Sequence, residues 1–125
     1  MQKATDTATK VFLAEGTRRG IKCCIAKPHD LLYEAARQCV VGQIATGECT
    51  HYLWTARYRR LKKSSLKRHI FSEVVSNGKD FEEVWDRILG SDWNVWIAKL
   101  SHKLIGAHIG VGNDGRYYAS LVFAD

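Results

Sequence analysis

The sequence predicts an α+β domain in which helices cover a mixed sheet. Three observations predict it: two helical segments precede a strand with period-two alternation at residues 69 to 78, two more helices follow it, and a glycine-rich hairpin closes the chain. Strands and helices do not alternate regularly, so a doubly wound parallel sheet is not expected. A chain of 125 residues provides one domain with one core, spanning residues 1 to 125.

The composition indicates a globular protein, with 46% hydrophobic and 26% charged residues. No run of residues approaches the ~20 apolar residues of a membrane-spanning helix, so no transmembrane segment is expected. Met1 is followed by polar "QKATDTATK" and not by a hydrophobic leader. We therefore expect either a cytoplasmic protein or a secreted or cell-surface protein whose leader has been removed.

The first half contains two predicted helices. Residues 5 to 15 form the first, which Thr5 or Asp6 can cap and Gly16 can end; its shared apolar face is Ala8, Val11 and Phe12. The second begins at Asp30, placed to cap it just after Pro28. Apolar residues recur along this second helix at helical spacing: Leu31, Leu32, Ala35, Ala36, Cys39 and Val40.

Residues 52 to 68 mix aromatic residues with many cations, which predicts a partly helical segment with a basic outer face. The strand "HIFSEVVSNG" follows, and both of its faces carry apolar residues. Glu73 on this strand is therefore expected to be at least partly buried. A buried carboxylate must be hydrogen-bonded, paired, bound to a metal or protonated.

The second half begins with a helix in "KDFEEVWDRILG", where Asp80 and Glu83 form a capping box and Gly90 ends the helix. A short helix in "DWNVWIAKLSHK" follows; its apolar stripe of Trp93, Trp96, Ile97 and Leu100 is expected in the core. The hairpin then turns at "NDG". One face of its first strand carries Gly106 and Gly110, which predicts close approach of another element. We expect His108 on that face to be packed or hydrogen-bonded and not a ligand.

Four cysteines lie in the first half of the chain: Cys23, Cys24, Cys39 and Cys49. Adjacent Cys23 and Cys24 are too close to bond to each other, so oxidation would pair each with Cys39 or Cys49. The alternative is that all four are reduced and some are small core residues. The spacing of zinc-binding cysteines is absent, so no structural metal is expected.

The net charge of +6 comes largely from "RYRRLKKSSLKRH", residues 57 to 69. Such a run can contact phosphates or an acidic partner, or it can be a solvated face. Finger spacing, ribonucleoprotein segments and phosphate-binding glycine loops are absent, so nucleic acid is a less favoured partner, though not excluded.

The order of these segments resembles the CAP superfamily of cysteine-rich secretory proteins, antigen 5 and pathogenesis-related 1 proteins. The stretch "GIKCCIAKPHDLLYEAARQCVVGQIATGECTH" is similar to the family's segment that leads to a histidine, here His51. "SEVVSNG" is similar to the strand that carries the family's glutamate, here Glu73, and "IGAHIGVGNDGRYYASLVFAD" to its closing hairpin. The resemblance covers most of the chain from about residue 8 and implies a three-layer α-β-α sandwich.

In typical members of the family, a cleft holds two histidines and two acids able to bind a divalent metal. Here the resemblance implies only half of that set, His51 and Glu73, because Trp93 or Asn94 stands at the second histidine and Ile88 at the second acid. His102 could substitute only with a different helix register. We therefore expect a degenerate cleft of His51, Glu73 and Asn94, in which Glu73 meets His51, with no catalytic residue, no cofactor and at most weak divalent metal binding.

The leading hypothesis is a non-enzymatic CAP-like interaction protein, secreted or surface-displayed, that binds an unidentified protein or lipid ligand. Its expected partner surface consists of Tyr52, Trp54, Arg57, Tyr58, Arg59, Arg60, Lys62, Lys63, Lys67 and Arg68. Two alternatives remain. One is a metal-dependent or weak acid/base site at His51 and Glu73; the other is a nucleic-acid or acidic-partner binder that uses residues 57 to 69. The resemblance also allows a lipid cleft between the helices, although no residue pattern selects it.

Overall fold

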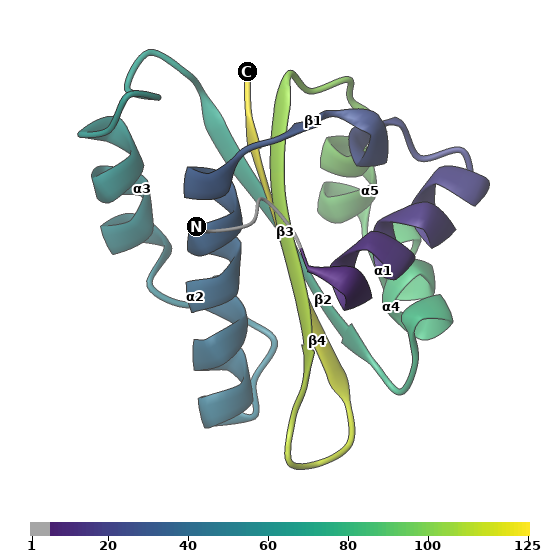
Figure 1. Cartoon of the computed structure of the whole chain (residues 1–125). Coiled ribbons are helices and arrows are strands. Elements are labelled where there is room, and N and C mark those ends of the chain that lie inside the picture. The colour runs from purple at the N-terminus through teal and green to yellow at the C-terminus, as the bar shows by residue number, and fades with distance from the viewer. Residues whose placement is uncertain (1–5) are drawn as a thin grey trace.

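The computed structural model describes residues 6–125, and within them the chain forms four strands and five α-helices in three layers (Figure 1). The strands are β1 (Lys27–Pro28), β2 (Phe71–Gly78), β3 (Leu104–Val111) and β4 (Tyr117–Ala124). They lie in the order β1-β3-β4-β2, with β1 parallel to β3 and the other pairs antiparallel. The predicted α+β class with a mixed sheet and a closing hairpin is confirmed.

Helices cover both faces of the sheet (Figure 1). α2 (Asp30–Thr46) and α3 (Trp54–Lys62) lie on one side, and α1 (Thr7–Arg18), α4 (Phe81–Leu89) and α5 (Asp92–Lys99) lie on the other. A short 3-10 helix, η1 (Lys22–Ile25), joins α1 to β1. Each face has its own apolar core, with Trp85 and Phe123 in one and Leu32 and Val122 in the other. Among residues 6–125, no helix has the length and apolar character needed to cross a membrane.

α1 is capped by Asp6, whose Oδ1 accepts a hydrogen bond of 2.8 Å from the Thr9 N–H; the other cap candidate, Thr5, lies outside the described residues. The predicted apolar face is wrong except for Phe12, because Ala8 and Val11 are exposed and Thr9, Phe12 and Gly16 are buried. Gly16 does not end the helix. A side chain at Gly16 would overlap Trp85, so this glycine serves close packing of α1 on α4.

α2 packs directly against β3, as the glycine face predicts. A Cβ atom at Gly106 would lie 1.9 Å from the carbonyl carbon of Leu32, so only glycine lets the helix backbone cross the strand here. The apolar stripe of α2 is buried except for Leu31. The predicted cap is shifted by one residue: Nδ1 of His29, not Asp30, accepts the hydrogen bond from the Leu31 N–H, at 3.1 Å.

The second half follows the predicted order of elements. Asp80 caps α4 by accepting a 2.8 Å hydrogen bond from the Glu83 N–H, and Gly90 ends the helix. The hairpin turn between β3 and β4 contains Gly115 in the left-handed conformation, with φ of 79°. The core prediction for α5 is wrong in part, because Ile97 is buried whereas Trp93, Trp96 and Leu100 are exposed.

All four cysteines are free thiols, so the proposed disulfide pairings are not present. Cys23 belongs to the core on the side of α1, α4 and α5, whereas Cys39 lies on α2 across the sheet. β1 is not predicted from the sequence, since two residues are too few to show an alternating pattern.

Candidate functional site

Glu73 lies under α3 and is almost fully buried. Four hydrogen bonds from three side chains reach its carboxylate. Oε1 is 2.8 Å from Nδ1 of His51 and 3.0 Å from Nη2 of Arg57, while Oε2 is 2.5 Å from Nη1 of Arg57 and 2.8 Å from Oγ of Ser120. The expected contact between His51 and Glu73 is therefore present. We call Glu73, His51, Arg57 and Ser120 the Glu73 cluster.

Arg57 is held as firmly as the carboxylate that it pairs with. Its Nε donates to the carbonyl of Tyr52 at 2.8 Å, and Nη1 also donates to the carbonyl of Ala35 at 3.2 Å. The guanidinium carbon lies 5.2 Å from the centre of the Trp54 ring, in cation–π contact. A buried arginine with a bidentate carboxylate and carbonyl acceptors is a paired structural charge.

The electrostatics of the cluster favour an ionised Glu73. Burial alone would raise the pKa of Glu73, but hydrogen bonds from His51 and Arg57, the charge of Arg57 and the hydrogen bond from Ser120 outweigh it and lower the pKa below its ordinary value. An ionised carboxylate can only accept hydrogen bonds, so His51 donates through an Nδ1–H group. The carboxylate thereby orients the imidazole, and Nε2 lies on the side of the ring that is directed away from Glu73.

The backbone brings these residues together through a turn before α3. Leu53 is the N-cap of α3 and has a left-handed conformation, with φ of 50° and ψ of 36°. This conformation is uncommon for a residue other than glycine and costs roughly 1–3 kcal/mol. The turn places His51 and Arg57, on opposite sides of Leu53 in sequence, against the same carboxylate.

A cavity of about 260 Å³ opens beside the cluster, and we call it the edge cavity. It is lined by His51, Trp54, Phe71, Ser72, Glu73 and Trp93. β2 is an edge strand of the sheet, and the cavity lies around its outer side, between α3 on one face and α5 on the other. Three of its six lining residues are aromatic and come from α3, β2 and α5, and His51, with 44% of its side chain exposed, supplies a polar group.

The cavity lacks an activated nucleophile. Ser72 is the hydroxyl in its wall, but successive side chains of a strand leave opposite faces, so Ser72 points away from the face that carries Glu73 and His51. Among the contacts of residues 6–125, no hydrogen bond joins Ser72 to His51. A nucleophile must lie within hydrogen-bond reach of its base.

The residues present do not fit the divalent metal that the CAP resemblance implies. Both oxygens of Glu73 accept hydrogen bonds from Arg57. A metal cation would have to displace this guanidinium and would be repelled by its positive charge. Within residues 6–125, no group of three or more histidine, cysteine, aspartate or glutamate side chains is placed to hold a metal ion. One histidine with a neutralised carboxylate is a poor ligand set for zinc.

His102 and Asn94 do not complete the site. His102 is engaged at both ring nitrogens, with Nδ1 3.0 Å from Oδ2 of Asp125 and Nε2 2.9 Å from the carbonyl of Ile97, and its ring stacks on Phe123. Asn94 does not line the edge cavity. Its Nδ2 donates to the carbonyl of Val75 at 3.1 Å and so ties α5 to the open edge of β2.

The expected partner surface divides into three groups. Arg57 is buried, which corrects its assignment to the surface. Four residues are half-buried because they pack against α2, Phe71 or each other: Tyr52, Trp54, Tyr58 and Lys62. The remaining five cations are exposed: Arg59, Arg60, Lys63, Lys67 and Arg68. The segment is ordered, as α3 followed by turns that Lys62 stabilises by donating to the carbonyls of Lys67 and His69.

Sequence reasoning missed two residues of the site, Arg57 as the partner of Glu73 and Ser120 as its second hydrogen-bonding side chain. Ser120 stands in the apolar run "YYASLVFA", and a single polar residue inside such a run signals a hydrogen bond in the core. Arg57 carries no comparable signal, because it stands in "RYRR" among other cations. Trp93 was expected in the core stripe of its helix or as the replacement for a histidine, whereas it lines the edge cavity.

Comparison with known proteins gives one useful result, and it concerns the fold. No protein-family model matches the sequence, and no curated protein matches it. Among solved structures, the chain is similar to an outer surface protein from Borrelia burgdorferi, with a TM-score of 0.71 and 14% sequence identity. The similarity covers 100% of this chain and 98% of that chain, so the whole three-layer arrangement is shared with a bacterial outer surface protein.

Proposed function

We propose that this chain is a non-enzymatic, surface-displayed binding domain of the CAP type, whose cleft binds a ligand through aromatic side chains and not through a metal. The observation that carries the proposal is the complete use of Glu73: Arg57, Ser120 and His51 occupy both carboxylate oxygens. The acid that would act on a substrate or hold a metal is instead a fixed part of the scaffold.

The remaining groups of the edge cavity are suited to binding. Trp93 is 58% exposed and Trp54 is half-buried, and the two stand on opposite sides of the β2 edge. Large, rigid aromatic side chains anchor protein and peptide ligands at little cost in conformational entropy. His51 adds a hydrogen-bonding group held in one orientation by Glu73. A peptide side chain is the kind of ligand that a cavity of about 260 Å³ can hold.

Surface display is supported by the shared fold with a protein described as an outer surface protein. The CAP assignment is supported by the order of the sequence segments and by a three-layer arrangement in which His51 and Glu73 meet. Surface display and the CAP assignment are both parts of this proposal.

The test for ligand binding uses a displayed library of random linear peptides, followed by calorimetry of an enriched peptide with two tryptophan variants. Trp93→Ala should weaken binding by about tenfold or more, because it removes an anchor from the cavity. Trp96→Ala is the control on the same helix: it is 56% exposed and does not line the edge cavity, but its ring centre lies 5.4 Å from that of Trp93, so a loss clearly smaller than that of Trp93→Ala is expected. Equal losses in both variants, or no enriched peptide, would contradict binding at the edge cavity.

The metal-dependent alternative is tested by titrating zinc into metal-stripped protein. We expect no saturable binding, because Arg57 neutralises Glu73. Binding that disappears in both His51→Ala and Glu73→Gln, with each variant shown to be folded by circular dichroism, would favour the metal-dependent function over the proposed one.

A further inference from the structure

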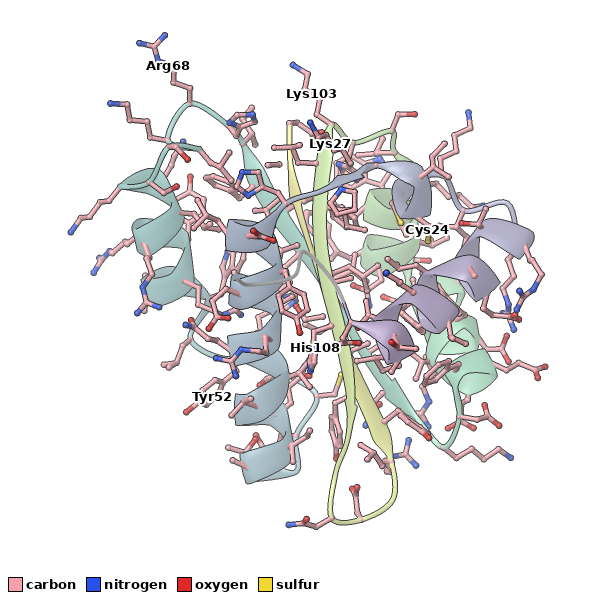
Figure 2. All side chains as sticks on the ribbon, in the orientation of Figure 1. Cys24, Lys27, Tyr52, Arg68, Lys103 and His108 are labelled. Carbon is pink, nitrogen blue, oxygen red and sulfur yellow. The ribbon has the colours of Figure 1, made fainter. Side chains whose placement is uncertain are left out.

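The strands of the sheet share one end at which cationic side chains gather. Lys27 opens β1, Lys103 directly precedes β3 and Arg68 lies in the turns before β2; Figure 2 shows all three pointing away from the same end of the molecule. Backbone contacts join these segments. The Lys27 N–H donates to the Lys103 carbonyl at 3.2 Å, and the Lys103 N–H donates to Oδ1 of Asp125 at 3.3 Å.

Two further cations belong to this end: Lys67 adjoins Arg68, and Lys99 ends α5 just before the chain turns into β3. We call Lys27, Lys67, Arg68, Lys99 and Lys103 the basic end. All five are exposed, and none of them forms an ion pair with a carboxylate of residues 6–125. The nearby carboxylate of Asp125 is engaged by His102 and by the Lys103 N–H.

Acidic residues gather at the opposite end of the strands. The start of α4, which follows the end of β2, carries Asp80, Glu82 and Glu83, and the turn between β3 and β4 carries Asp114. Cations stand among these acids, since Arg87 and Arg116 pair with Glu83 at 3.6 and 3.5 Å, so this end has mixed charge. The basic end differs in that its five cations lack such pairs within residues 6–125, and a one-sided cluster of cations attracts an anionic surface.

Exposed aliphatic side chains stand among these cations. Ile70, directly before β2, is 73% exposed, and Ile25, two residues before Lys27, is also 73% exposed. Leu100 follows Lys99 and is exposed as well. These residues lie in short connecting segments, where exposure of a large aliphatic side chain to water does not stabilise the fold.

We infer that the basic end is a docking surface for an anionic phospholipid membrane. The five cations contact the lipid phosphates, while Ile25, Ile70 and Leu100 enter the boundary between headgroups and acyl chains. Charge attraction combined with burial of apolar side chains is the usual basis of reversible binding at a membrane surface. A soluble polyanion would satisfy the cations but would leave the aliphatic side chains in water, so the combination favours lipid. The inference is independent of the edge cavity and goes beyond the proposed function.

The experiment is co-sedimentation of the protein with two kinds of vesicle, phosphatidylcholine alone and phosphatidylcholine mixed with phosphatidylglycerol. We expect binding only to the mixed vesicles, and binding that weakens as salt is added. The charge reversal Lys27→Glu with Lys103→Glu should lower the binding constant about tenfold or more, since each cation near an anionic membrane contributes to attraction. The matched control reverses exposed Lys10 and Arg59, which gives the same net charge and leaves the basic end intact.

Ile70→Gln separates lipid from a soluble polyanion. It should weaken vesicle binding several-fold and leave binding to heparin unchanged, because only a membrane offers an apolar phase. Absence of binding to the mixed vesicles at low salt would overturn the inference. Equal losses in the two charge-reversal variants, or an Ile70→Gln variant that binds vesicles like the parent, would also overturn it, in favour of non-specific attraction or a polyanion partner.

Discussion

Arg57 and Glu73 form a bidentate ion pair beneath α3, with Nη1 2.5 Å from Oε2 and Nη2 3.0 Å from Oε1. Both side chains are almost fully buried. The positive charge that neutralises Glu73 therefore comes from the protein itself. The contribution of this pair to the free energy of unfolding can be measured directly.

A double-mutant cycle should show strong coupling between these two residues. Arg57→Met should destabilise the protein by about 3–5 kcal/mol, because it leaves Glu73 as a buried charge without its main partner. Glu73→Leu should cost a similar amount for the converse reason. The double variant should be more stable than the sum of the two losses predicts, since it removes both charges. Urea unfolding followed by circular dichroism measures all four proteins, and additive losses would show that the residues do not stabilise each other.

Gly106→Ala should destabilise the protein by about 3 kcal/mol or more, because its Cβ would lie 1.9 Å from the backbone of α2 at Leu32. Gly110→Ala is the control on the same face of β3. There the Cβ would lie 3.2 Å from Cδ1 of Ile44 and 3.3 Å from Cγ1 of Val40, side-chain atoms that need to shift by only a few tenths of an ångström, so the loss should be much smaller. The comparison uses thermal and urea unfolding. Equal losses at the two positions would mean that contact with α2 is not what requires glycine at 106.

The stability of the protein should decrease as the pH falls below about 6.5, the ordinary pKa of histidine, partly because of His108. Burial lowers the pKa of His108, and the nearby charge of Arg37 lowers it further, although Asp6, 2.9 Å away, and Glu34 oppose this. The unfolded chain therefore binds a proton at a higher pH than the folded chain does. Stability is complete above the unfolded pKa and is lost as the pH falls below it.

This pH dependence can be assigned to one residue. His108→Asn should reduce the slope of unfolding free energy against pH, measured by urea titration at a series of pH values. An unchanged slope in His108→Asn would assign the effect elsewhere.

The cysteines should differ in reactivity toward a thiol reagent in the folded protein. Burial raises the pKa of the Cys39 thiol to about 12, and a hydrogen bond with Cys24 together with burial raises the pKa of Cys23. Since the thiolate is the reactive form, buried Cys23 and Cys39 should be alkylated last, after half-buried Cys24 and Cys49. Peptide mass spectrometry after brief alkylation gives the order, with urea-unfolded protein as the control. Rapid labelling of Cys39 would show that its part of the sheet face opens.

The features that could be predicted from the sequence depend on local residue patterns, such as alternation along a strand or glycines on one face of it. The alternation of β2 predicted a buried Glu73, and the glycines of β3 predicted the approach of α2. Tertiary packing decided the rest. Nothing local distinguishes Arg57 from its neighbouring arginines, and only the turn at Leu53 brings it to Glu73. Trp93 and Trp96 have the spacing of a core stripe, but α5 lies at the edge of the sheet, where Ile97 and Ala98 are enough to cover it.

The sheet order also determines when the chain can acquire its structure during synthesis. The central strands β3 and β4 are residues 104 to 124, and every other layer of the molecule packs on them or on strands that pair with them. β1 and β2 do not pair with each other, and α2 has no surface to cover until β3 has emerged. The complete sheet can therefore form only after the closing hairpin has been made, and until then the face of α2 that covers β3 and β4 stays exposed. We expect closure of this hairpin to be a late step in folding, and incomplete chains that end before residue 104 to expose apolar surface.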